Sequence, residues 1–303
     1  MNDIKYILGV SGGADSMCIL HQVLGNRCQA SDIIVAHLNH NLRDNADSDE
    51  EFVKQYCLTN GIEFISKKEN VAKYAQDNKI SIETAGRILR YQFFAEIAEQ
   101  YQNAIVMTAH NKNDSVESFI MHLLRGASLS GLCGIREKSK AGRLNIHRPL
   151  INMSRAEIEE YNRIHNVPYI EDETNSDTKY KRNEIRHNIL PLLDIDMISK
   201  AISRLQVDED YLQEVTLRRC EECVSATRQS NAFDILWFNS LHLALKRRII
   251  HTLARKFTTQ TISGERIDEA ISAIEKNIGN KTIQFPDGIR LTIKDSIVKL
   301  ERR

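Results

Sequence analysis

The 303-residue chain carries 41 basic and 41 acidic residues, so its net charge is zero and overall charge does not indicate a nucleic-acid partner. Its hydrophobic fraction of 42% and charged fraction of 27% are typical of a globular protein with one large domain or two smaller ones. Six cysteines are too few for a disulfide framework, no run of 18 apolar residues is present and no secretion signal precedes the first strand, so we expect a cytoplasmic protein with no membrane span.

Strand and helix patterns alternate in the first half of the chain. Short apolar runs predict strands at 4–10, 33–37, 62–65 and 104–109. Amphipathic segments predict helices at 15–24, 47–60, 71–77, 83–101 and 114–124. This alternation is typical of an α/β fold with a Rossmann-like, doubly wound parallel sheet that helices cover on both faces.

The second half becomes mainly helical. A capping box at Ser154 and Glu157 predicts a helix at 154–166, a polar loop follows at 172–180, and 182–193 is helical with Pro191 near its end. Further helices are predicted at 198–227, 241–257 and 265–276, and a hairpin at 286–288. We therefore expect an α/β catalytic domain over residues 1–195 and a smaller, mainly helical domain over residues 196–303.

A glycine-rich turn follows the first strand and opens a helix. It reads Ser11-Gly12-Gly13-Ala14-Asp15-Ser16. Its glycines allow close backbone approach to a ligand, and its free amides at a helix N-terminus form an anion site. Asp15 repels phosphate unless it holds Mg²⁺. The alternative is a plain turn; the segment lacks the Gly-Lys-Ser/Thr of a Walker A loop and is not a GxGxxG fingerprint.

Carboxylates follow the fourth strand. His110, Asp114 and Glu117 are spaced i, i+4 and i+7 on one helix face, at the end of the sheet where ligands bind. Asp114 and Glu117 together with Asp15 predict a Mg²⁺ site. The alternative is a solvated helix face.

Basic residues gather in several places. Arg87 and Arg90 lie on one apolar helix and suit phosphate contacts, although they could also be surface arginines that snorkel over the core. Three basic clusters suit an RNA backbone or a solvated face, and we favour RNA. They comprise Lys179, Lys181, Arg182, Arg186 and His187; Arg136, Lys138, Lys140, Arg143 and Arg148; and Lys246, Arg247, Arg248, Arg255 and Lys256.

Cys220 and Cys223 form a lone CxxC pair. A zinc site would need two further ligands at matching spacing, and none is obvious, so we expect ordinary helix residues.

The Ser-Gly-Gly-x-Asp-Ser turn resembles the PP-loop of the ATP pyrophosphatases, which have an adenine nucleotide alpha hydrolase-like fold. Four further segments resemble tRNA(Ile)-lysidine synthetases: 38–43 (LNHNLR), 83–94 (ETAGRILRYQFF), 109–118 (AHNKNDSVES, continued by LLRG at 123–126) and 172–177 (DETNSD, followed by RNEIR at 182–186). Together the segments cover residues 4 to about 195.

The resemblance implies an enzyme, a carbon–nitrogen ligase that uses ATP and Mg²⁺. Such an enzyme adenylates carbon 2 of the wobble cytidine in tRNA(Ile) with a CAU anticodon, releases pyrophosphate, and lets L-lysine displace AMP. By resemblance, the catalytic residues are Asp15, Asp114, Glu117, His110, Arg90 and Arg182. ATP would contact residues 11–16 and His40. The helical domain would bind tRNA, and the resemblance leaves both a monomer and a homodimer open.

The chain departs from the family pattern at several positions. Asn39 and Asn113 replace aspartates, and Asn111 replaces a histidine. If the aspartate at 113 binds metal in the family, metal binding is weaker here. Two alternatives remain. A tRNA thiolase needs catalytic cysteines that this first domain lacks in a suitable motif, and a degenerate homologue would bind tRNA without catalysis.

Overall fold

The computed structural model describes residues 4–26, 28–41, 46–171, 181–227, 231–258 and 260–302. The chain divides into two compact units, residues 1–205 and 206–303. The division falls inside a long helix, α9 (Ile195–Thr227), whereas the sequence suggests a boundary near residue 195. No helix in the described part of the chain is both long and apolar enough to cross a membrane.

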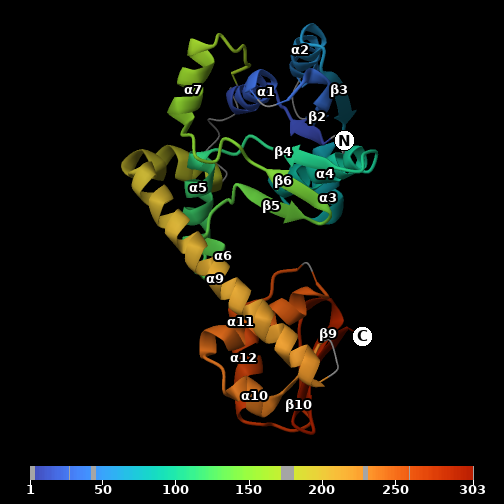
Figure 1. Ribbon diagram of the computed structural model, residues 1–303, viewed down its shortest axis with the longest axis vertical. Coiled ribbons are helices and arrows are strands. Elements are labelled where there is room, and N and C mark those ends of the chain that lie inside the picture. Colours follow the sequence, from blue (N-terminus) through green and yellow to red (C-terminus); the bar gives the residue numbers. More distant parts are fainter. Residues whose placement is uncertain are drawn as a thin grey trace. The chain divides into compact units, whose positions relative to one another are not determined.

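The first unit is built on a six-stranded sheet with the order β3-β2-β1-β4-β6-β5 (Figure 1). Five strands run parallel, and β5 pairs antiparallel with β6 at the edge. The strands are β1 (Lys5–Gly9), β2 (Ile33–Asn39), β3 (Glu63–Lys68), β4 (Ala104–Met107), β5 (Lys138–Ala141) and β6 (Leu144–His147). The predicted parallel sheet is therefore confirmed, with one antiparallel hairpin added.

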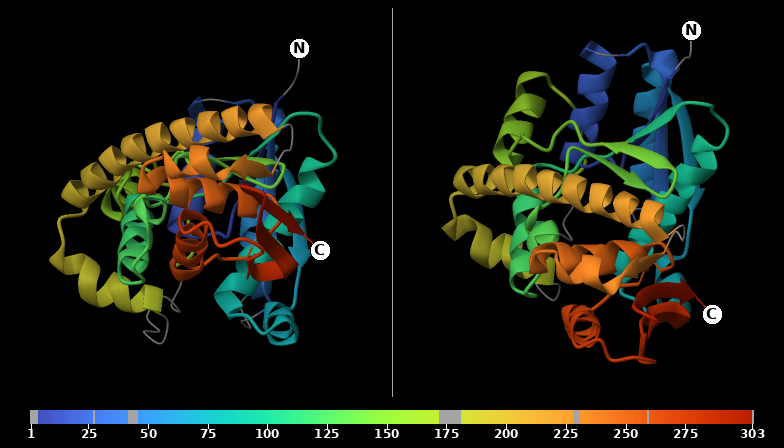
Figure 2. Two further views of the ribbon diagram at one scale, coloured as in Figure 1. Left: turned by 90° about the horizontal axis from the view of Figure 1, so that it is seen from below. Right: turned by 60° about the horizontal axis from the view of Figure 1, so that its bottom comes forward.

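Helices cover both faces of this sheet (Figure 1 and Figure 2). One face packs on α1 (Ala14–Asn26), α2 (Ala46–Thr59) and α7 (Arg155–Ile164). The other packs on α3 (Val71–Asn78) and α4 (Ile82–Ala98). The interior strand β2 is buried along its whole length because both faces are covered, as its apolar sequence requires.

The rest of the first unit packs around α5 (Lys112–Leu123) and the short α6 (Leu129–Leu132). The predicted helix at 182–193 is broken into α8 (Lys181–Glu184), a π-helical turn (Ile185–Ile189) and a 3₁₀ turn (Leu190–Leu192) that contains Pro191. Ile185 and Leu190 of this segment pack on Val116 and Ile120 of α5. The predicted loop at 172–180 and its DETNSD motif lie outside the described residues.

The second unit combines helices with a four-stranded antiparallel sheet. Besides the part of α9 that it contains, its helices are α10 (Ile235–Asn239), α11 (Leu243–Arg255) and α12 (Gly264–Glu275). Its sheet has the order β7-β10-β9-β8, from β7 (Ala232–Asp234), β8 (Thr282–Gln284), β9 (Ile289–Lys294) and β10 (Ile297–Arg302). The predicted hairpin at 286–288 is confirmed as the β8–β9 connection. The rest of the sheet was not expected from the sequence.

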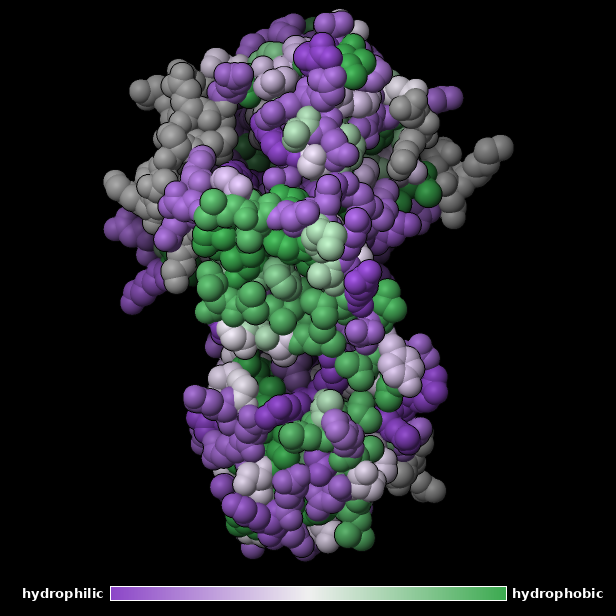
Figure 3. Space-filling model, turned by 90° about the vertical axis from the view of Figure 1, so that its left-hand side faces the viewer, coloured by the Kyte–Doolittle hydropathy of each residue, from purple (hydrophilic) through white to green (hydrophobic). Residues whose placement is uncertain are grey.

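Apolar side chains gather on the face drawn in Figure 3. Within the first unit, exposed apolar residues lie from the end of the 3₁₀ turn to the first turn of α9; they include Leu192, Leu193 and Met197. Such exposed groups are typical of interaction surfaces.

Candidate active site

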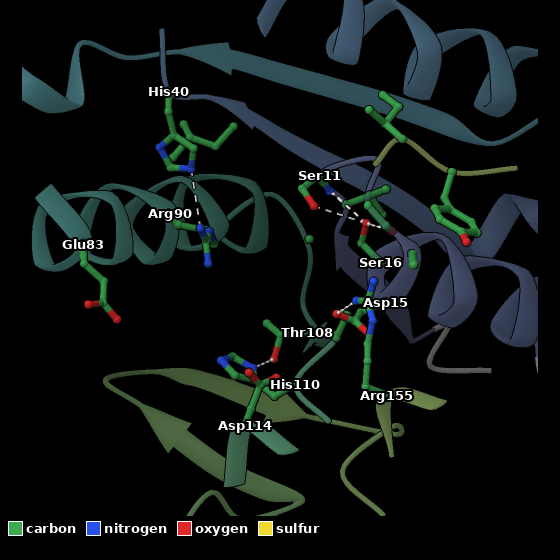
Figure 4. Close-up of a pocket in the computed structure, with 18 of the residues that line it drawn as sticks. Ser11, Asp15, Ser16, His40, Glu83, Arg90, Thr108, His110, Asp114 and Arg155 are labelled. Atoms are coloured by element: carbon green, nitrogen blue, oxygen red, sulfur yellow. Dashed lines mark hydrogen bonds and ion pairs between the residues drawn. The ribbon is translucent and has the colours of Figure 1, made fainter. Parts of the chain in front are cut away.

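A pocket of about 940 Å³ opens at the carboxyl ends of β1, β2 and β4 in the first unit. This edge is where ligands bind in open α/β sheets, and the volume suits a nucleotide-sized ligand. Figure 4 shows the loop at 11–16 and Arg155 on one side of the pocket, and His40 and Arg90 on the other. The predicted residues that line it are Ser11, Gly13, Ala14, Asp15, Ser16, His40, Arg90, His110, Asp114 and Arg182.

The loop between β1 and α1 is closed by its own hydroxyl groups. The Ser16 Oγ donates to the Gly13 carbonyl at 2.9 Å and accepts from the Ser11 amide at 3.2 Å. Gly12 has a φ of +93°, which favours glycine, and its carbonyl accepts from the Ile170 amide at 2.9 Å. Gly12 itself does not line the pocket, so its part is to shape the turn.

Asp15 projects from this loop and is held from two directions. Arg155 Nη1 donates to its Oδ2 at 2.8 Å, and Asn111 Nδ2 donates to its Oδ1 at 3.2 Å. Burial raises the pKa of Asp15 and the charge of Asp114 adds to the rise, while Arg155 and Asn111 oppose it. Two carboxylates therefore share this side of the pocket, an arrangement that favours a bound cation.

The asparagines that depart from the family pattern have structural partners. Asn111 caps α5, because its Oδ1 accepts from the Asp114 amide at 3.0 Å. The Asn113 Oδ1 accepts from the backbone amide of Arg155 at 3.0 Å. Asn113 thus satisfies a free amide at the start of α7, a role that needs no charge.

Asn39 is also explained by its contacts. It is buried, and its Nδ2 donates to Asp47 Oδ1 at 2.9 Å and to Glu50 Oε2 at 3.0 Å. An aspartate here would set three carboxylates together, so an amide donor is the residue that this environment requires.

Glu117 lies behind the pocket and pairs with two arginines. Its side chain is 0% exposed and does not line the pocket. Arg182 Nε donates to one carboxylate oxygen and Arg186 Nε to the other, each at 2.7 Å. In this structure Glu117 therefore orients these two guanidiniums, and because it lies outside the pocket we do not include it in the proposed Mg²⁺ site.

Asp114 belongs to the same network but also faces the pocket. Arg182 Nη2 lies 3.0 Å from its Oδ1, and the charges of Asp114 and Glu117 raise the pKa of Arg182 against the effect of burial. Among the described residues, no group of three or more His, Cys, Asp or Glu side chains is arranged to hold a metal ion. A Mg²⁺ site here would rest on two carboxylates, Asp15 and Asp114.

His110 lines the pocket beside Thr108. Its Nδ1 is 2.9 Å from Thr108 Oγ1. Burial, followed by the charges of Arg148, Arg182, Arg90 and Arg87, lowers the pKa of His110 to about 3. The imidazole is therefore neutral at pH 7 in a strongly cationic environment, which suits a polyanionic ligand.

Arg90 extends from α4 toward His40. The distance from its Nη2 to His40 Nε2 is 3.4 Å, and burial lowers the pKa of Arg90. His40 in turn packs on Gly86 of the same helix, where an added Cβ would lie 3.3 Å from the imidazole. Residues 42–43 of this motif lie outside the described residues.

The three basic clusters differ in what their side chains contact. Arg182 and Arg186 line the pocket, whereas Lys179 lies outside the described residues. Arg148 is buried and donates to the Arg136 carbonyl at 2.8 Å, so it is not available to a phosphate backbone. In the third cluster, each of three cations has its own acid: Lys246 with Glu275, Arg247 with Asp268 and Arg248 with Glu209.

Cys220 and Cys223 are core residues, as expected. Both are buried in the second unit, and burial raises the pKa of Cys223 to about 12. None of the six cysteines, all of which the structure describes, lines the pocket.

Several pocket residues were missed by sequence reasoning. Arg155 and Glu159 come from α7, Glu83 from α4, and Thr108 from the end of β4. A signal for Arg155 existed: it is the first residue of a capped helix, where the helix dipole disfavours a cation.

Comparison with known proteins identifies the family to which the first unit is similar. The model of the PP-loop domain family matches residues 1–193. A curated tRNA(Ile)-lysidine synthase of Clostridium tetani is 34% identical over 297 residues, which are 94% of this chain and 62% of that protein. A tRNA(Ile)-lysidine synthase of Clostridioides difficile is 33% identical over 313 residues, 97% of this chain and 66% of that protein. The chain thus spans slightly less than two thirds of the length of these relatives.

A solved structure gives the same fold. The U34-tRNA thiolase of Methanococcus maripaludis, which holds a [4Fe-4S] cluster, superposes with a TM-score of 0.54 at 16% identity, over 67% of this chain and 72% of that one. This likeness concerns the fold alone.

Proposed function

Because the chain belongs to the PP-loop family, we propose that it is a tRNA(Ile)-lysidine synthase, an ATP-dependent carbon–nitrogen ligase. Its substrates would be ATP, L-lysine and tRNA(Ile) with a CAU anticodon. The relatives of that name, which match most of this chain at about one third identity, support the proposal.

One observation carries the proposal. Five segments that lie far apart in the sequence supply side chains to one pocket: the loop at 11–16, His40 after β2, Arg90 on α4, Asp114 on α5 and Arg182 on α8. These are the segments that resemble lysidine synthetases. A protein that shared only the fold would not need these particular side chains to line one pocket.

The first chemical step would be adenylation. The carbonyl oxygen on carbon 2 of cytidine attacks the α-phosphorus of ATP, and pyrophosphate leaves with its bonding electrons. The loop amides at the start of α1 and the guanidiniums of Arg182 and Arg186 would stabilise the charge on the phosphates. Arg90 is held by His40 on the opposite side of the pocket and can orient the nucleotide or the base.

A Mg²⁺ ion fits this site with two ligands rather than three. Asp15 and Asp114 face the pocket, and burial together with the charge of Asp114 raises the pKa of Asp15. When bound, the ion would offset the negative charge of the polyphosphate. Hard oxygen ligands supplemented by water and phosphate are typical of magnesium.

The second step would bring in lysine. The ε-amine attacks carbon 2 and loses a proton, and AMP leaves with the former carbonyl oxygen. Acidic side chains line the same pocket and could bind the lysine ammonium groups; they are Glu83, Asp114, Glu159 and Glu171. A target base must leave its stack to reach the pocket.

A tRNA thiolase is the alternative within the family, and the geometry disfavours it. Cys18 is buried behind the loop, and burial together with the charge of Asp15 raises its pKa to about 12. A thiolase nucleophile needs an accessible thiolate. A degenerate homologue without catalysis is disfavoured by Asp15 and Asp114, which both face the pocket.

The remaining partner assignments are also proposals. The second unit, residues 206–303, would contribute to tRNA binding. The exposed Leu192, Leu193 and Met197 would suit a homodimer contact. We also propose a reducing, cytoplasmic location, which the absence of a disulfide among the six described cysteines supports.

The test is incorporation of radiolabelled L-lysine into tRNA(Ile) transcripts with a CAU anticodon, with ATP and Mg²⁺ present or omitted. We expect ATP-dependent labelling of the wobble cytidine and none in a transcript with a uridine at that position. Pyrophosphate release without labelling would indicate another PP-loop modification. Absence of both would indicate a tRNA-binding protein.

A further inference from the structure

Arg155 and a divalent cation would compete for the carboxylate of Asp15. Arg155 Nη1 lies 2.8 Å from Asp15 Oδ2, and the other oxygen of Asp15 accepts from Asn111 at 3.2 Å. Each oxygen already accepts one hydrogen bond, and the positive charge of Arg155 lies where it would repel a cation bound to Asp15, so the two cations compete for this carboxylate.

Of the two donors, Arg155 is the one free to move. Asn111 is buried and fixed as the cap of α5. The Arg155 side chain is 43% exposed and ends a long flexible stem. Its backbone is anchored, since the Asn113 Oδ1 accepts from its amide at 3.0 Å. The guanidinium can therefore change partners while its Cα stays in place.

The pocket offers a second partner for that guanidinium. Arg155 lines the same cavity as Ser11, Gly13 and Ser16 of the loop (Figure 4). Phosphates bound at this loop would lie within the volume that Arg155 borders. A planar guanidinium is well suited to two phosphate oxygens.

We propose that Arg155 is a polyphosphate-binding residue that exchanges partners: it neutralises Asp15 until a divalent cation takes that carboxylate, and then pairs with the phosphates. Glu159, whose Oε1 accepts from Arg155 Nε at 2.7 Å, keeps the stem aligned along the pocket in both arrangements. The proposal rests on the proposed function in that the polyphosphate is taken to be that of ATP.

The test uses the full chain and compares Arg155→Gln with Arg163→Gln. Arg163 lies on the same helix but pairs with Glu160 and is mostly exposed, so it is the matched control. Mn²⁺ alone is titrated by electron paramagnetic resonance. Inorganic pyrophosphate with Mg²⁺, and AMP without metal, are titrated by calorimetry. Circular dichroism verifies the fold of each variant.

We expect Arg155→Gln to bind Mn²⁺ about fivefold more tightly, because a competing ion pair is gone. It should bind magnesium pyrophosphate about tenfold more weakly, because a charge-assisted contact is lost. AMP affinity and the Arg163→Gln control should match the wild type, and Arg155→Lys should recover part of the pyrophosphate affinity.

A purely structural ion pair would give a different pattern. Mn²⁺ affinity that is unchanged or lower in Arg155→Gln would overturn the exchange, and unchanged pyrophosphate affinity would overturn the phosphate contact. If the wild type binds these ligands as expected but attaches no lysine to tRNA, the proposed function fails and the exchange stands. If the wild type binds no pyrophosphate, both fail.

Discussion

Both units contain clusters of basic residues in the sequence, but the arginines of the two clusters differ in how they pair with acids. In the pocket of the first unit, Arg182 and Arg186 share Asp114 and Glu117, and their guanidiniums border a cavity. In the second unit, Arg247 and Arg248 each pair with one acid of their own. A basic cluster therefore indicates an anion site only when its cations share acids beside a cavity. One-to-one pairs join helices.

The largest effect is expected from Glu117→Gln, which removes the shared acid. Arg182 and Arg186 would then keep their charges with Asp114 and, for Arg182, Glu83 as the remaining acids; since both arginines are partly exposed, we expect the free energy of unfolding to fall by roughly 3 kcal/mol. Urea denaturation measures the change. Asp268→Asn in the second unit is the control, because its pair is about half exposed on each side and should change stability by about 1 kcal/mol or less. Equal losses in the two variants would remove the distinction between the clusters.

Asp15→Asn should act on chemistry more than on stability. Loss of one charged group in the pocket should slow pyrophosphate release by about 10²–10³-fold, as for other preorganised electrostatic groups. The partly exposed pair with Arg155 contributes little to folding, so the midpoint of urea unfolding should stay close to that of the wild type. Pyrophosphate release is followed by a coupled colorimetric assay. Activity near the wild-type level would rule out Asp15 as a metal ligand.

His110 makes the first unit sensitive to acid. Its pKa is about 3 in the folded protein and about 6.5 when unfolded, so below pH 6.5 the unfolded state binds the extra proton. Stability is thus fully present above pH 6.5 and falls as the pH decreases toward 3, by about 1 kcal/mol between pH 7 and pH 5.5. His110→Asn should reduce this slope when urea unfolding is repeated across that range. A slope that stays the same in the variant would contradict the lowered pKa.

The smallest effect is expected from Arg247→Gln. Its exposed pair with Asp268 should contribute no more than about 1 kcal/mol to stability. Affinity for tRNA and its dependence on salt should also stay near the wild type, as measured by filter binding. A clear decrease in the salt dependence would mean that Arg247 contacts a phosphate, and the comparison of the two units would then need revision.

Local signals predicted most of the first unit. Every strand and helix expected over residues 4–124 is present, and so is the helix that Ser154 caps. Apolar periodicity and helix caps determine these elements directly. The β5–β6 hairpin was missed because Lys138 and Lys140 make it look like a charged loop. The strands form only because β6 adds to the edge of the sheet beside β4.

The site was predicted in part for a similar reason. Helical spacing places Asp114 and Glu117 on one face, but it does not reveal that Arg182 and Arg186 cover the second carboxylate. Arg155 reaches Asp15 from a helix that begins 140 residues later in the chain. Such contacts depend on tertiary packing, which no local pattern carries.

The loop at 11–16 also has a consequence for synthesis on the ribosome. Its backbone is tied to late parts of the chain: the Gly12 carbonyl accepts from Ile170, the Ala14 carbonyl accepts from Asn162, and Asp15 pairs with Arg155. These partners emerge roughly 10–30 s after the loop at ordinary translation rates. The loop is thus among the first segments made, but the site around it is completed late in the synthesis of the first unit, and nucleotide can find the whole pocket only on a nascent chain that extends past Arg186.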